Sequence, residues 1–146
     1  MRAGFWLIVV LMLAGCGKGD SASYLVGGNR DHSLSLVREK AWYWSDWEVF
    51  LVVTRQPECM RRHAIAKSSA KAEFKVDMYD ADGAYVLRTG SHWYVAETGK
   101  CQMQEYPAPP PEPGSPVGTW TDSSGQLRFV AAPAATPRPP PPAASP

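Results

Sequence analysis

Apolar and polar residues alternate along much of the chain, with the two-residue period that is typical of β-strands. In the clearest segment, Phe74, Val76 and Met78 share one face while charged residues take the other. Comparable patterns predict further strands at residues 33–37, 47–54, 84–88, 92–96 and 101–104. Because turn-forming residues separate these segments at short intervals, the sequence predicts an all-β fold, a small antiparallel sandwich or open barrel in meander order, over residues 34–106.

Two segments, 47–54 and 60–67, depart from this simple alternation. The first is apolar on both faces at its centre, which predicts a strand in the middle of a sheet, and Pro57 ends it. The second combines alanines with basic residues, and its pattern suits a helix and a short strand equally well.

The last third of the chain holds almost all of the prolines. Residues 107–117 predict a stiff, Pro-rich linker. Residues 118–130 resemble a β-hairpin, which either docks on the main sheet through Trp120 and Phe129 or stays loose, because a lone hairpin is marginal in water. Residues 131–146 are rich in Pro and Ala, and we expect a disordered tail.

The N-terminus carries a short apolar run, residues 5–13, preceded by Arg2. At about 1.5 Å per residue, a helix of this length is far short of the ~30 Å hydrocarbon core of a bilayer. Residues 1–15 therefore predict a signal peptide. Residues 16–33 are rich in Gly, Ser, Asn and Asp after the initial cysteine, and we expect a flexible tether there.

The charge of the chain argues against one class of partner. The formal net charge is +1, and loss of residues 1–15 would remove Arg2 and leave equal numbers of acidic and basic residues. A neutral domain has no electrostatic attraction for nucleic acid or for an anionic membrane surface. We therefore expect no nucleic-acid partner.

The sequence Leu13-Ala14-Gly15-Cys16 resembles the lipobox of bacterial lipoproteins. The resemblance implies cleavage after Gly15 and acylation of Cys16 with the two or more chains that stable anchoring needs. In such lipoproteins an Asp after the lipidated cysteine usually retains the protein in the inner membrane, whereas this chain has Gly17. For a Gram-negative source, the resemblance implies an outer-membrane lipoprotein that faces the periplasm, and otherwise a lipoprotein of the cell membrane.

The chain has three cysteines, and assigning Cys16 to lipid leaves Cys59 and Cys101 as an even pair in an oxidising compartment. We predict that they form a disulfide, which a small domain with a thin core needs as a covalent staple. A redox or metal site is the alternative, but no C-x-x-C motif occurs, and only His63 lies at ligand spacing from Cys59. We expect no metal and no cofactor.

The most unusual feature is an aromatic cluster, made of Trp42, Tyr43, Trp44, Asp46 and Trp47. In an extended chain Trp42 and Trp44 share one face and Tyr43 takes the other. Burial in the core is the first expectation, because large aromatics supply much of the core of a small domain. The alternatives are an exposed surface for a protein partner and a surface that stacks on sugar rings beside Asp46.

No motif in the chain favours an enzyme. Asp31-His32-Ser33 holds the residue types of a hydrolase triad, but adjacent side chains cannot converge on one another, and no G-x-S-x-G motif occurs. Asp80 and Asp82 match half of a calcium loop, but the remaining ligands are missing, and a hairpin turn is favoured.

These features together predict a non-enzymatic lipoprotein, anchored through acyl chains on Cys16. Its β domain would contact a protein or another component of the cell envelope. The alternative is a module that binds glycan or peptidoglycan through the aromatic cluster, and a hydrolase or metal-binding protein is least favoured.

Overall fold

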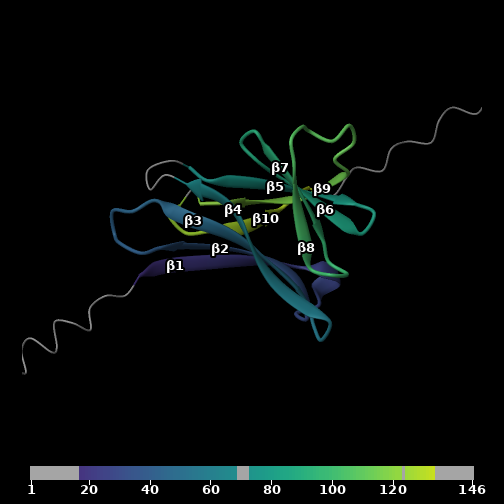
Figure 1. The fold of residues 1–146 in the computed structure, drawn as a ribbon, viewed down its shortest axis with the longest axis horizontal. Coiled ribbons are helices and arrows are strands. Elements are labelled where there is room, and N and C mark those ends of the chain that lie inside the picture. Colours follow the sequence, from purple (N-terminus) through teal and green to yellow (C-terminus); the bar gives the residue numbers. More distant parts are fainter. Residues whose placement is uncertain (1–16, 69–72, 123, 134–146) are drawn as a thin grey trace, which may run out of the picture.

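Two antiparallel β-sheets face each other in the computed structural model, which describes residues 17–68, 73–122 and 124–133 (Figure 1). Over these residues the chain forms ten strands and one short 3-10 turn, η1 (Val26–Gly28). The strands are β1 (Lys18–Leu25), β2 (His32–Lys40), β3 (Trp47–Arg55), β4 (Cys59–Ser68), β5 (Lys75–Ala81), β6 (Ala84–Thr89), β7 (His92–Glu97), β8 (Gln102–Tyr106), β9 (Ser115–Thr121) and β10 (Arg128–Ala131). The predicted all-β sandwich is confirmed.

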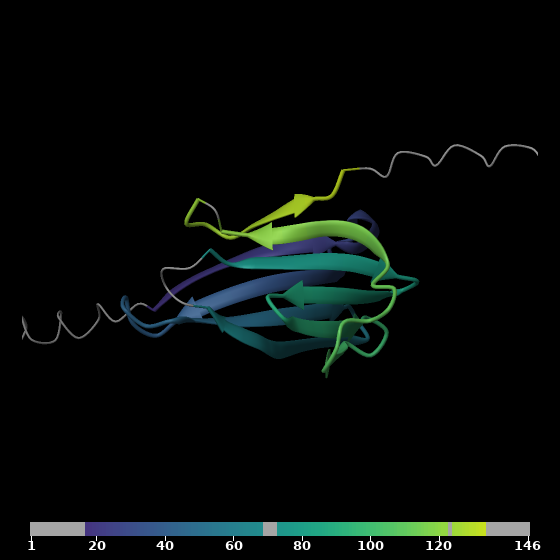
Figure 2. The same ribbon diagram turned by 90° about the horizontal axis from the view of Figure 1, so that it is seen from above.

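The smaller sheet has the order β1-β2-β3-β4, and the larger has the order β10-β9-β5-β6-β7-β8. In the larger sheet β9 pairs with β5, so the C-terminal hairpin extends that sheet instead of standing alone. Figure 2 shows the hairpin, in green and yellow, along one edge of the sandwich. Trp120 is fully buried, and the predicted hairpin therefore docks on the domain.

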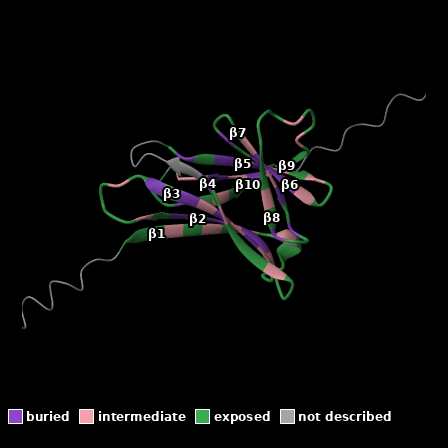
Figure 3. Ribbon diagram, in the orientation of Figure 1, coloured by how far each residue is buried: buried purple, intermediate pink, exposed green. Residues whose placement is uncertain are grey.

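Alternation places one face of most strands in the core between the sheets, visible as purple segments in Figure 3. Phe74, Val76 and Met78 share the buried face, as predicted. Strand β3 lies between β2 and β4, in the interior position expected from its apolar centre. The largest fully buried apolar side chains are Leu34, Leu36, Val49, Leu51, Val53, Val76, Met78, Leu87, Cys101 and Trp120.

The predicted tether over residues 16–33 is wrong from residue 18 onward. Residues 18–25 form strand β1, which pairs along its whole length with β2, from Lys18 opposite Lys40 to Leu25 opposite Ser33. The strand is mostly small and polar because it lies at a sheet edge, where backbone hydrogen bonds stabilise it more than apolar burial. The domain therefore begins at β1, and no flexible segment separates it from residue 17.

Other boundaries also differ from the expectation. The ambiguous segment 60–67 belongs to strand β4, and β9 begins at Ser115, inside the predicted linker. The signal peptide, Cys16 and residues 134–146 of the predicted tail lie outside the described residues.

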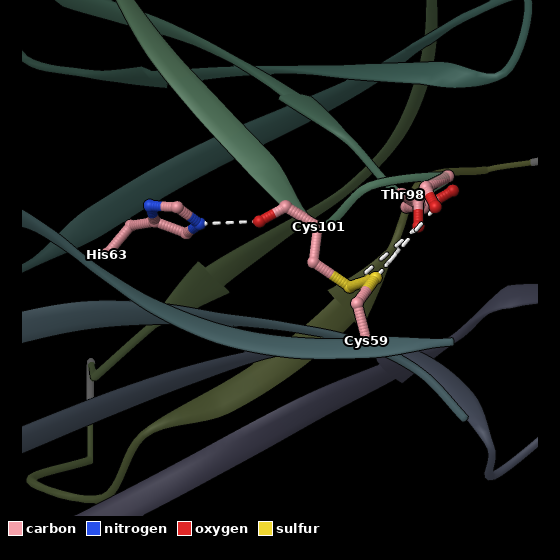
Figure 4. The surroundings of a disulfide bond; sticks show 5 residues. Cys59, His63, Thr98 and Cys101 are labelled. Atoms are coloured by element: carbon pink, nitrogen blue, oxygen red, sulfur yellow. Dashed lines mark hydrogen bonds between the residues drawn. A yellow bond between two sulfur atoms is a disulfide. The ribbon is translucent and has the colours of Figure 1, made fainter. Parts of the chain in front are cut away.

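A disulfide joins Cys59 and Cys101 on one side of the sandwich, as predicted, with their Cα atoms 5.9 Å apart (Figure 4). Cys59 begins β4 and Cys101 directly precedes β8, so the bond connects edge strands of the two sheets. The imidazole Nε2 of His63 lies 2.8 Å from the carbonyl oxygen of Cys101, which adds a polar contact across the same edge.

A buried cation connects the sheets on the other side. Arg38 in β2 is only 1% exposed. Its guanidinium donates two hydrogen bonds to Asp20 in β1, at 2.5 and 2.9 Å, and one to Asp122, directly after β9, at 2.5 Å. The Trp120 indole also donates to the carbonyl oxygen of Ala22 at 2.9 Å. These contacts close the open edge of the sandwich between β1 and the C-terminal hairpin.

The Asp20 carboxylate is held in its charged form. Burial raises the pKa of Asp20, but hydrogen bonds from Arg38 and from the Leu127 backbone N–H, together with the Arg38 charge, outweigh this effect and leave the pKa below its ordinary value. A carboxyl whose pKa is lowered by folding contributes stability above its unfolded pKa, and that contribution is lost as the pH falls through the folded value.

The two described ends of the domain lie far apart. Gly17 adjoins the start of β1, whereas Pro133 follows β10, and β1 and β10 run side by side in the same direction. Figure 2 shows β1 beginning and β10 ending at opposite ends of the sandwich.

We predict that replacing both cysteines, Cys59→Ser with Cys101→Ser, lowers the free energy of unfolding by about 4 kcal/mol, because the bond constrains the unfolded chain between them. Urea unfolding followed by circular dichroism measures the change. Reduced wild type should match the double variant, and an unchanged midpoint in both would show that the bond does not stabilise the domain.

We predict that Asp20→Asn lowers the free energy of unfolding by about 2 kcal/mol at neutral pH, because Arg38 loses a charge-assisted hydrogen bond. The difference from wild type should shrink as the pH falls below about 4, where Asp20 of the unfolded chain begins to protonate, and it should vanish once the pH is below the lowered pKa of folded Asp20. Urea unfolding at a series of pH values measures it. Asp31→Asn, at an exposed carboxylate, is the control and should show neither effect.

Candidate functional site

Residues 41–46, which we call the aromatic loop, connect β2 to β3. A tight turn closes the loop: the backbone N–H of Ser45 donates to the carbonyl oxygen of Trp42 at 3.1 Å, and the Ser45 hydroxyl donates to the same oxygen at 2.9 Å. The Trp42 N–H in turn lies 3.2 Å from the Ser45 hydroxyl oxygen. Ser45 therefore holds the turn of the aromatic loop together.

Three aromatic side chains of this loop point into solvent. The exposed fractions are 62% for Trp42, 84% for Tyr43 and 79% for Trp44. Trp42 and Trp44 stack on each other, with ring centroids 6.0 Å apart and planes 12° from parallel. They do so in a turn and not in the extended chain for which the spacing places them on one face. Burial of these rings in the core, the first expectation from the sequence, is wrong. Exposed aromatics grouped in this way make the loop a candidate contact surface.

Lys40 supports the loop from the end of β2. Its ammonium group donates to the carbonyl oxygen of Tyr43 at 2.7 Å and lies 5.2 Å from the centre of the Tyr43 ring. The same nitrogen lies 4.8 Å from the centre of the Trp47 ring. Lys40 therefore contacts both Tyr43 within the loop and Trp47 directly after it.

Trp47 is buried, unlike the other aromatic residues of the predicted cluster. It is the first residue of β3, only 7% exposed, and its ring lies 4.5 Å from the Arg38 guanidinium carbon. Trp47 therefore belongs to the core and not to the group of exposed rings. Asp46 remains exposed at the end of the loop.

The aromatic loop lies beside the first described residue of the chain. Lys18 pairs with Lys40, and a Cβ placed on Gly17 would be 3.1 Å from the carbonyl oxygen of Lys40. A shallow surface hollow is lined by Gly17, Lys18, Gly19, Glu39, Lys40, Ala41 and Glu48. We call this end of the sandwich, with Lys18, Lys40 and the aromatic loop, the loop end; in Figure 1 it lies at the left.

The other residues considered from the sequence do not come together. His32 is half-buried, and its Nε2 has no hydrogen-bond partner among the described residues. His92 lies 2.9 Å from Glu105 on the larger sheet, and Asp80 accepts from the backbone of Gly83 at 3.3 Å within the predicted hairpin turn. In the described part of the chain, no group of three or more His, Cys, Asp or Glu residues is placed to hold a metal ion.

Two features of the site have no clear signal in the sequence. The first is the pairing of Lys18 with Lys40. It depends on strand β1, whose polar composition predicts a tether instead of a strand. The contacts of Arg38 with Asp20 and Asp122 join residues 18 and 84 positions apart. The only sequence signal for strand β1 is the weak alternation of Ala22 and Tyr24, which are both half-buried.

Comparisons of the chain with protein families, with curated proteins and with solved structures found no match. Among the described residues, no helix has the length and apolar character needed to cross a bilayer. The candidate site therefore stands on its own geometry.

We predict that Trp42→Ala combined with Trp44→Ala changes the free energy of unfolding by less than about 0.5 kcal/mol, because exposed side chains contribute little to folding. Trp120→Ala should lower it by about 4 kcal/mol, because it empties a fully buried site. Urea unfolding of the three proteins gives the comparison. A large loss in the double variant would show that the aromatic loop serves the fold.

Proposed function

We propose that this protein is a non-enzymatic lipoprotein of the cell envelope, anchored through Cys16. In a Gram-negative source it is anchored in the outer membrane and faces the periplasm, and otherwise it is anchored in the cell membrane. Its rigid sandwich makes contact with another envelope component through the aromatic loop. The observation that carries the proposal is the exposure of Trp42, Tyr43 and Trp44 in a closed turn. A soluble domain does not normally leave such rings in water without a partner.

The disulfide supports the proposed location. Cys59 and Cys101 are bonded to each other, and such bonds persist in oxidising compartments outside the cytoplasm. This agrees with the lipobox at residues 13–16, which implies export and acylation.

A glycan-binding module is the second candidate, because stacked, exposed indoles offer flat apolar faces to sugar rings. Asp46 lies on the same loop and is exposed. In this case purified peptidoglycan would retain wild type and not the Trp42→Ala and Trp44→Ala variant.

The anchor is tested by Cys16→Ser in the full chain, expressed in a Gram-negative host. Wild type should carry the added mass of acyl chains and fractionate with the outer membrane. The variant should lose both properties, because no sulfur remains to accept the diacylglyceryl group. Intact-mass spectrometry and membrane fractionation provide the two measurements.

The matched control is the double variant at Cys59 and Cys101, which removes the other two thiols and should keep the acyl mass. Lipid that persists in Cys16→Ser, or a wild-type chain without lipid, would contradict the proposal.

A further inference from the structure

We propose that the aromatic loop inserts into the headgroup interface of the same bilayer that holds the acyl chains of Cys16. The inference rests on the proposed function and names the partner of its contact surface as the membrane. It commits to lipid, whereas glycan and protein partners become outcomes of the test below.

The first argument is the distance between the anchor and the loop. Cys16 is two positions before Lys18, and consecutive Cα atoms are about 3.8 Å apart. Lys18 is paired with Lys40, which is two positions before Trp42. Acyl chains on Cys16 therefore enter the bilayer within a few residues of the exposed rings, and they draw the loop end toward the surface.

The second argument is the absence of a spacer between Cys16 and the domain. A flexible segment over residues 17–33 would let the sandwich stand away from the membrane. Instead, β1 begins at Lys18 and is hydrogen-bonded to β2 over its full length. Asp20 in this strand is also held by the buried Arg38. The strand is thus anchored in the domain, and the loop end cannot move far from the acylated residue.

The third argument is the chemistry of the loop. Tryptophan and tyrosine favour the membrane–water interface, because their rings are apolar while their N–H and O–H groups remain hydrogen-bonded to water or headgroups. Three such rings stand at 62%, 84% and 79% exposure beside the anchor. Contacts from Lys40 and Ser45 already order the loop, so little conformational entropy is lost when it enters the interface.

The charges around the loop favour apolar contact over electrostatic attraction. Lys18 and Lys40 lie at this end, but Glu48 lines the same hollow, and Glu39 is paired with Arg62. Asp46 on the loop adds a further negative charge. Because the basic and acidic groups offset one another, the contact should depend little on salt, unlike that of a polybasic segment.

The experiment uses the acylated full-length protein reconstituted into vesicles of phosphatidylethanolamine and phosphatidylglycerol, with and without dibrominated phosphatidylcholine. Bromine atoms quench tryptophan fluorescence at short range. We expect brominated lipid to quench wild type at least about twofold more than the Trp42→Ala and Trp44→Ala variant, because the remaining indoles lie in the core or on strand faces. Raising the salt concentration should leave this difference unchanged.

The matched control places a ring at the opposite end of the sandwich. In the double-variant background, Leu25→Trp restores an exposed indole at the end of β1, where Leu25 is 37% exposed. Brominated lipid should not quench this indole. The contrast separates position at the loop end from exposure alone, and near-ultraviolet circular dichroism confirms that both variants retain the fold.

Three outcomes overturn the inference in different ways. Equal quenching of wild type and the double variant in acylated protein overturns the membrane contact alone and leaves the lipoprotein proposal in place. Iodide in the water quenches exposed tryptophans and gives a second measurement. If the loop becomes protected from iodide only after peptidoglycan or an envelope protein is added, the surface is assigned to that partner instead. A chain that carries no acyl mass overturns the proposed function, and this inference with it.

Discussion

The rest of the structure depends on one interaction, the pairing of the buried Arg38 guanidinium with Asp20 and Asp122. A cation that is 1% exposed must be matched by charge and by hydrogen-bond acceptors, since uncompensated desolvation costs several kcal/mol. Asp20 and Asp122 supply both, and each also accepts a backbone N–H, from Leu127 and Phe74 respectively. Because the carboxylates come from the two different sheets, satisfying one side chain fixes β1 against the C-terminal hairpin.

This constraint combines with the disulfide on the other side of the sandwich. The ionic contacts close the edge formed by β1 and β10, and the bond between Cys59 and Cys101 closes the edge formed by β4 and β8. A small domain with exposed sheet edges is prone to pairing with other chains. Here the ion pairs of Arg38 cross one open edge of the sandwich and the disulfide crosses the other. The fixed position of β1 also determines where the aromatic loop lies relative to Gly17.

Much of the fold follows from local pattern, but the site does not. Alternation predicts β5 and the strands after it, because Val76 and its neighbours face a dry core. Strand β1 is not predicted from the sequence, because its small polar residues have the composition of a tether. Backbone pairing with β2 and the contact of Asp20 with Arg38, which is distant in sequence, hold it in place. The aromatic cluster has a buried part and an exposed part, because Trp47 begins β3 and faces inward while residues 42–44 form a turn. Residue spacing alone does not show where the strand begins.

The opposite positions of Gly17 and Pro133 give the molecule a direction. A nine-residue strand such as β2 spans roughly 30 Å. In the proposed orientation, with an acylated Cys16 in the lipid, Pro133 lies about that distance into the aqueous compartment. In that orientation the C-terminal end of β10 faces away from the lipid, and it is accessible from the water without displacement of the proposed anchor.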